Sequence, residues 1–164
     1  MPSHVPLPMH PADTTVANLL LQRALGRSAV ESFGLSHQTP FLEFRDDEPA
    51  DHMLSIDTDM TSNVSFDESL SLTADERRLL IFNRVNLRSV TRVACDDDGN
   101  LFLDFDNGVQ LRFAGTSAEG YEPWQLGNGM PLHEPGGYLL IAQSGGGYAI
   151  WDGPAAPLIP GQDT

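Results

Sequence analysis

Residues 121–151 read YEPWQLGNGMPLHEPGGYLLIAQSGGGYAIW, and this stretch decides the fold class. It contains both tryptophans of the chain, Trp124 and Trp151, among several Gly and Pro residues. Large aromatic side chains bury much apolar area at a low cost in rotamer entropy, and glycines allow tight turns between strands. We therefore expect a small β core, with both tryptophans largely buried and residues 145–147 forming a hairpin turn rather than a phosphate-binding loop.

Two further hairpins are predicted upstream of this stretch. Residues 101–105 and 109–113 alternate apolar and polar side chains, as half-buried antiparallel strands do. The dipeptide Asn107-Gly108 lies between them, and Asp98-Gly99 joins the first of them to an expected strand over 87–95. Both dipeptides favour the positive φ angles of a tight hairpin.

A helix is predicted ahead of each set of strands. Thr73 and Glu76 have the spacing of a capping box, which predicts a helix over 74–82. Apolar residues at helical spacing predict another over 14–25, with Asp13 as its N-cap. We expect a polar loop over 57–71 and further strands over 29–35, 41–44, 53–56, 121–126, 138–142 and 147–151.

The two halves of the chain resemble each other at an offset of sixty residues. Leu19-Leu20-Leu21 and Leu79-Leu80-Ile81 keep this offset, as do Val30 and Val90. Each half reads helix, strand, strand, strand. The predicted fold is therefore α+β, with two helix-plus-antiparallel-β-meander repeats that form a sandwich or an open barrel. Chance similarity between two amphipathic hairpins is the alternative.

The length of 164 residues favours one domain. We expect a single α+β domain over residues 12–152, flanked by a loose N-terminal arm (1–11) and a loose, Pro-rich C-terminal tail (153–164). Within that domain the predicted parts are two related halves, 12–61 and 72–116, and a C-terminal region of aromatic and Gly-rich strands, 119–152.

Net charge is the strongest signal in the composition. The chain has 23 acidic and 9 basic residues, a net charge of −14, and every basic residue is Arg. Such a protein is repelled by nucleic acids and anionic membranes and attracted to basic partners, so we expect neither nucleic acid nor membrane as a partner. The alternative is that the acidity only keeps the protein soluble. The N-terminus has neither a basic start nor an apolar run, which predicts a cytoplasmic protein.

The residues that enzymes use are largely missing. Without Lys there can be no Gly-Lys-Ser/Thr phosphate loop and no Schiff-base chemistry, and no Gly-x-Ser-x-Gly elbow occurs. Cys95 is followed by three Asp residues, and this favours an inert thiol. We therefore expect a protein that is not an enzyme and needs no cofactor.

Metal sites are not expected either. The five His residues do not have the spacing of metal ligands. Asp57, Asp59, Thr61 and Glu68 match four positions of a calcium-binding EF-hand loop, but Ser62 stands where the loop needs Gly. A solvated acidic loop is the interpretation that these residues favour.

Several short motifs between Leu25 and Trp151 together resemble a family of small bacterial domains of unknown function. The matching motifs are Gly26-Arg27, Val30, Asn107-Gly108, Tyr121-Glu122-Pro123-Trp124-Gln125-Leu126 and Gly145-Gly146-Gly147-Tyr148-Ala149-Ile150-Trp151. The chain departs from the family pattern at Ser144, where the family has Pro. The family resembles immunity proteins of bacterial toxin systems, including contact-dependent inhibition, and the resemblance carries no catalytic residues over.

These observations predict an immunity protein that binds and neutralises a basic cytotoxic domain, with a nuclease as the expected toxin. A nuclease holds a polyanion with Arg and Lys, and an inhibitor can present carboxylates in the place of that polyanion. We expect a monomer that forms a heterodimer with its toxin; a non-enzymatic scaffold or adaptor is the alternative function. The predicted toxin-binding residues are Asp96, Asp97, Asp98, Asp104 and Asp106 and, as a second choice, Asp46, Asp47, Glu48 and Asp51.

Overall fold

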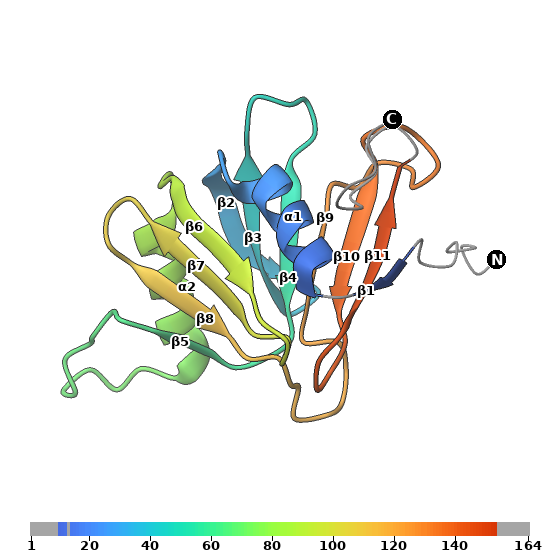
Figure 1. Ribbon diagram of the computed structural model, residues 1–164. Helices are drawn as coiled ribbons and strands as arrows, with labels where there is room; N and C mark the ends of the chain where they lie inside the picture. Colours follow the sequence, from blue (N-terminus) through green and yellow to red (C-terminus); the bar gives the residue numbers. More distant parts are fainter. Residues whose placement is uncertain (1–9, 13, 154–164) are drawn as a thin grey trace.

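The computed structural model of the chain describes residues 10–12 and 14–153. Within these residues lie two helices, α1 (Thr14–Leu25) and α2 (Ala74–Val85), and eleven strands (Figure 1). All pairs of adjacent strands are antiparallel, and they form two sheets that do not close into a barrel. The fold is α+β, as the sequence predicts.

The larger sheet has seven strands and the smaller sheet has four. Across the larger sheet the order is β1 (His10–Ala12), β11 (Tyr148–Asp152), β10 (Tyr138–Ala142), β9 (Trp124–Gly127), β4 (His52–Ile56), β3 (Thr39–Arg45) and β2 (Ala29–Ser36). Across the smaller sheet it is β5 (Met60–Ser62), β8 (Gln110–Phe113), β7 (Leu101–Phe105) and β6 (Val90–Cys95). Strand β9 of the C-terminal region pairs with β4. The C-terminal strands therefore continue the sheet that β2, β3 and β4 begin.

The sixty-residue offset recurs where the edges of the two sheets meet. The backbone N–H of Val30 donates to the carbonyl of Arg88 at 3.1 Å, and the N–H of Val90 donates to the carbonyl of Ser28 at 2.9 Å. Both β2 and β6 also carry a bulge directly after these valines. Equivalent residues of the two halves thus make equivalent contacts across an approximate twofold axis.

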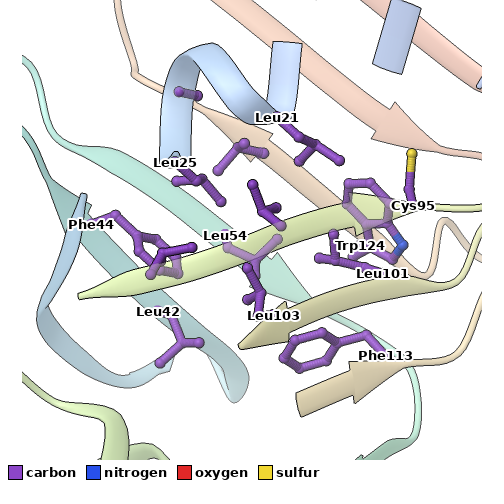
Figure 2. Packing of buried hydrophobic residues seen from close by; sticks show 14 of the residues in the cluster. Leu21, Leu25, Leu42, Phe44, Leu54, Cys95, Leu101, Leu103, Phe113 and Trp124 are labelled. Carbon is purple, nitrogen blue, oxygen red and sulfur yellow. The ribbon is translucent and has the colours of Figure 1, made fainter. Parts of the chain in front are cut away.

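Each helix packs on a strand of the other half. Helix α1 contacts β6 and β11, and α2 contacts β2. The apolar side of α1 faces the space between the sheets, where Leu21 and Leu25 lie over Leu54 and Phe44 of the larger sheet (Figure 2). Burial of these side chains is the main stabilising term for a fold of this size.

The two tryptophans are buried as predicted but lie on opposite faces of the larger sheet. Trp124 is 1% exposed and belongs to the core, whereas Trp151 is 9% exposed and lies outside the core cluster. The register explains this difference: Trp151 pairs with Leu139, while the adjacent pair of Ile150 and Leu140 points into the core.

Three sequence predictions require correction. Residues 57–71 are not entirely loop, because Met60–Ser62 forms β5 against β8. The N-terminal arm is not loose throughout, because His10–Ala12 pairs with β11 as β1. Gly153 is not loose, since its N–H donates to the carbonyl of Gly137 at 2.8 Å. Residues 1–9, Asp13 and residues 154–164 lie outside the described residues.

Two of the predicted turns contain a glycine with positive φ, but the tight two-residue turn lies elsewhere. Gly99 and Gly108 have φ values of 82° and 84°, whereas the preceding Asp98 and Asn107 do not adopt positive φ. The tight two-residue turn lies between β2 and β3 instead, where His37 and Gln38 have φ values of 49° and 68°. A His-Gln pair gives no turn signal in the sequence, because it is not one of the Asn-Gly, Asp-Gly or Gly-Gly dipeptides that are typical of such turns.

Candidate functional site

Two chain segments cross side by side from one sheet to the other. One connects β4 to β5, and the other connects β8 to β9. They are tied together by the N–H of Asp57, which donates to the carbonyl of Pro123 at 2.8 Å, and by the Thr58 hydroxyl, which donates to the carbonyl of Thr116 at 2.7 Å. Arg78 of α2 adds a bond to the Thr58 carbonyl at 3.1 Å. The double crossover is therefore a well-supported part of the backbone.

An acidic cavity of about 340 Å³ opens beside this double crossover. Asp57 and Asp59 line it from the first segment, Glu119 from the second and Asp75 from the first turn of α2. Leu35 of β2 forms part of its wall and is 47% exposed. The cavity thus combines four carboxylates from distant parts of the sequence with an exposed apolar side chain, and Arg78 is the one basic residue in its lining.

A second cavity of about 420 Å³ adjoins the first and shares Asp57 with it. Glu122 and Tyr121 line this second cavity, and the Tyr121 side chain is 57% exposed. Tyrosine and other aromatics are enriched at the centres of protein interfaces, because they bury a large area with few rotatable bonds. We define the crossover surface as Asp57, Asp59, Asp75, Glu119 and Glu122 with the apolar residues Leu35 and Tyr121.

The carboxylates of the crossover surface have no internal partners. Its five acidic side chains accept no hydrogen bond and form no ion pair within the described part of the chain. All five are exposed. A partner could therefore engage them without first breaking an internal contact.

In the first predicted cluster, Asp96 and Asp97 already accept hydrogen bonds from other residues of the protein. The Asp96 carboxylate accepts hydrogen bonds from the N–H of Asp98 and from the backbone and side-chain nitrogens of Asn100, at 2.9–3.0 Å. Asp97 accepts a hydrogen bond from the Thr14 hydroxyl. Asp96 shapes the β6–β7 turn, and Asp97 ties this turn to α1. Asp97 and Asp98 are both exposed, but only the Asp98 carboxylate accepts no hydrogen bond within the described residues.

Asp104 and Asp106 do not form one array with this turn. Strand β7 spans five residues, and at about 3.4 Å per residue it places Asp106 about 17 Å from the β6–β7 turn. Asp104 pairs in register with Arg92, so a basic residue lies beside it on the outer face of the smaller sheet. Arg112 lies over the Phe102 ring on this face, at 5.2 Å from its centroid. The face therefore has a mixed charge.

In the second predicted cluster, Asp46 and Asp51 also have partners within the protein. Asp46 accepts a hydrogen bond from the N–H of Glu48 at 2.8 Å and lies 2.8 Å from Nε2 of the buried His52. Asp51 pairs with Arg45 at 3.3 Å. The exposed carboxylates of Asp47 and Glu48 remain, but Arg23 and Arg27 line the same cavity of about 430 Å³.

His52 belongs to a buried polar network behind this cluster. Its Nδ1 lies 2.6 Å from the Tyr138 hydroxyl, so both ring nitrogens have partners. Arg23 lies over the Tyr138 ring and forms an ion pair with the buried Asp152 at 2.8 Å. Burial raises the pKa of Tyr138. Because each of these polar groups is satisfied, the network acts as a structural tie between α1 and the larger sheet rather than as an open catalytic site.

The Cys95 thiol is buried, and burial raises its pKa to about 11, with a smaller contribution from Asp96 and Asp97. The thiolate is the reactive form, so this environment makes the thiol unreactive at neutral pH. The thiol side chain interacts with Tyr148, whose hydroxyl donates to the carbonyl of Asp96. Cys95 therefore supports the end of β6.

Nothing among the described residues resembles a metal site. No group of three or more His, Cys, Asp or Glu side chains there could hold an ion. Asp57 and Asp59 of the calcium-like pattern lie on the crossover, and Thr61 lies in β5. The residues therefore adopt strand and crossover geometry instead of an EF-hand loop.

The sequence predicted an acidic docking surface but gave no indication of the crossover surface. Asp57 and Asp59 belong to one acidic stretch of the sequence, and Glu119 and Glu122 to another. They meet only because the two crossovers run side by side. The signal that could have pointed to them is the placement of exposed acids next to Tyr121 in a segment that joins two predicted sheets.

Comparison with known proteins finds no matching protein family, no matching curated protein and no matching solved structure. The resemblance to immunity proteins therefore stays a prediction from the sequence. Neither of the two described helices is long and apolar enough to cross a membrane.

Proposed function

We propose that this protein is an immunity protein that binds a basic cytotoxic domain, a nuclease, in the cytoplasm and neutralises it through the crossover surface. The observation that carries this proposal is the set of five exposed carboxylates without internal partners around two adjoining cavities. The net charge of −14 gives the whole molecule the sign that attracts such a partner.

The site combines two features that protein inhibitors need. Its carboxylates can pair with the Arg and Lys side chains that a nuclease uses to hold phosphates, which favours fast and specific association. Leu35 and Tyr121 offer exposed apolar surface beside those charges. Buried apolar anchors supply most of the affinity of an interface, while the surrounding charges set its orientation and specificity.

The hydrogen bonds across the double crossover also favour tight binding. Thr58 and Thr116 hold the two segments together, and Arg78 holds them to α2. A surface that is ordered before binding loses little conformational entropy in the complex. We propose that the protein acts by binding alone, as a monomer that forms a heterodimer with the toxin, so the purified protein should show no hydrolase or transferase activity.

The test is protection of growing cells. Any basic domain encoded by a neighbouring gene is expressed from an inducible promoter, with and without this protein, and growth and the formation of a purified one-to-one complex are measured. The proposal predicts rescue of growth by the wild-type protein. It also predicts loss of rescue when Asp57→Asn, Asp59→Asn and Glu119→Gln are combined.

The control variant combines Asp98→Asn, Asp104→Asn and Asp106→Asn, which removes the same number of charges away from the crossover surface. It should still rescue growth. Failure of the wild-type protein to form a complex with any neighbouring basic domain would contradict the proposal. A robust enzymatic turnover that is lost on a single carboxylate substitution would do so as well.

A further inference from the structure

The four edges of the two sheets differ in how they are protected. Among the described residues, strands β1 and β5 are three residues each, too short to offer a long edge. The edge of β6 is covered by α1: the Asn18 side chain bonds both the N–H and the carbonyl of Cys95, and Gln22 bonds the carbonyl of Val93. An uncovered long edge is a template for pairing with another chain, so these devices protect three of the four edges.

Strand β2 is the fourth edge, and α2 does not protect it in the same way. At the offset of sixty residues, Arg78 and Phe82 stand in the places of Asn18 and Gln22. The Phe82 ring meets the Phe33 ring edge to face at 6.4 Å, and Arg78 donates to the Thr58 carbonyl instead of the β2 backbone. The helix therefore packs beside β2 without capping its edge.

The hairpin register shows which backbone groups of β2 are open. Ser36 pairs with Thr39 across the two-residue turn, which makes this pair and the pair of Gly34 with Phe41 hydrogen-bonded. The N–H and carbonyl groups of Phe33 and Leu35 must then point away from β3. No described residue forms a hydrogen bond with them on that side.

The charges beside the β2 edge favour a particular kind of partner strand. The Leu35 side chain lies in the wall of the cavity that Asp57, Asp59, Asp75 and Glu119 also line. A strand that is added beside β2 would carry alternate side chains toward these carboxylates. Charge complementarity therefore favours a strand with basic residues at every second position.

We infer that the docking segment of the basic partner is an extended chain that adds to the larger sheet beside residues 32–36 of β2 and places Arg or Lys side chains in the acidic cavity. This inference rests on the proposed function and deepens it by giving the partner's binding mode. Backbone hydrogen bonds to Phe33 and Leu35 contribute affinity, and the acidic cavity contributes sequence preference.

The probe is a short acetylated peptide of alternating Arg and Val, with an otherwise identical peptide N-methylated at alternate residues as its control. Both peptides have the same charge, but the methylated one cannot donate hydrogen bonds along one edge. We expect the methylated peptide to bind at least about tenfold more weakly. We also expect hydrogen exchange at the Phe33 and Leu35 amides to slow when the unmodified peptide binds, with little change at the Gly34 amide.

On the protein side, Leu35→Pro removes an outward-facing N–H without removing a bond to β3, and Leu35→Ala keeps that N–H. We expect Leu35→Pro to weaken peptide binding by about tenfold and Leu35→Ala by less. Equal binding of both peptides, or unchanged exchange at Phe33 and Leu35, would overturn the strand-addition inference. If removal of the Asp57, Asp59 and Glu119 charges still weakens binding, the acidic docking surface stands; if it does not, the proposed function fails as well.

Discussion

The indole nitrogen of Trp124 donates a hydrogen bond to the carbonyl oxygen of Gly99 at 2.8 Å. This bond joins the aromatic C-terminal region to the turn between β6 and β7, so it ties the two sheets together. The Trp124 ring also lies 5.9 Å from the Tyr148 ring, measured between centroids. One side chain thus supplies both apolar burial and a polar tie in the core.

Substitution of Trp124 should be among the most destabilising changes in the chain. We expect Trp124→Ala to lower the free energy of unfolding by about 3–5 kcal/mol, since it leaves a large cavity and an unpaired Gly99 carbonyl. Trp151→Ala should cost less, because Trp151 lies on the other face of the sheet. Urea denaturation of both variants measures this. Equal midpoints for Trp124→Ala and the wild type would contradict the assignment of Trp124 to the core.

Gly115 lies close to the backbone of the β6–β7 turn, and substitution of this glycine tests the contact. A Cβ on Gly115 would lie 2.0 Å from the carbonyl oxygen of Asp98, whereas a Cβ on Gly108 would meet nothing within 4 Å. We expect Gly115→Ala to cost about 2–3 kcal/mol through overpacking. Gly108→Ala should cost about 1 kcal/mol, because only its positive φ is unfavourable. Thermal unfolding of the two variants gives the comparison, and a smaller loss for Gly115→Ala would refute the contact.

The cap that α1 places on β6 gives a third prediction. Asn18→Asp retains an acceptor for the Cys95 N–H but loses the donor to the Cys95 carbonyl. We expect a loss of about 1–3 kcal/mol, since the carbonyl is left without its partner in a part-buried position. The matched control is Asn83→Asp on the exposed side of α2, which should change stability little. Similar losses for both variants would show that added charge, not the cap, is responsible.

The raised pKa of Cys95 predicts how the stability of the protein depends on pH. Burial raises the pKa of this thiol from 9.0 to about 11, so the folded protein retains the proton over a range in which the unfolded chain has lost it. The stabilisation is complete below pH 9 and is lost as the pH rises toward about 11. We expect wild-type stability to fall more steeply than that of Cys95→Ala across this window. Parallel curves would contradict the raised pKa.

Alkylation provides a separate measure of the same environment. Iodoacetamide should react with Cys95 slowly at pH 8 in the folded protein and much faster in urea, because the thiolate is the nucleophile. Fast labelling of the folded protein would show that the thiol is accessible and ionised.

Local sequence signals predicted most of the secondary structure. The α1 boundaries, the capping box of Thr73 and Glu76 and the strand over Leu101–Phe105 all agree with the structure. These features depend on neighbouring residues, so the sequence suffices. Strand β5 was missed because its three residues are mostly polar and are held by pairing with β8, a long-range contact.

The candidate site could not be predicted to the same extent. The sequence indicates acidic stretches. It does not show that Asp96 accepts a hydrogen bond from Asn100 or that Asp46 pairs with His52. These pairings, and the meeting of Asp57 with Glu119, arise from tertiary packing. The acids that remain free are therefore visible only once the two crossovers are placed side by side.

The most direct test of the crossover surface is the kinetics of binding to the proposed basic cytotoxic partner at two salt concentrations. One variant combines Asp57→Asn, Asp59→Asn and Glu119→Gln; the control combines Asp98→Asn, Asp104→Asn and Asp106→Asn. We predict that the first variant dissociates faster by about tenfold or more at both salt concentrations, since it loses carboxylates within the interface. The control should only associate more slowly, with an effect that is screened at the higher salt. Equal dissociation rates for the two variants, or a larger effect in the control, would contradict docking through the crossover surface.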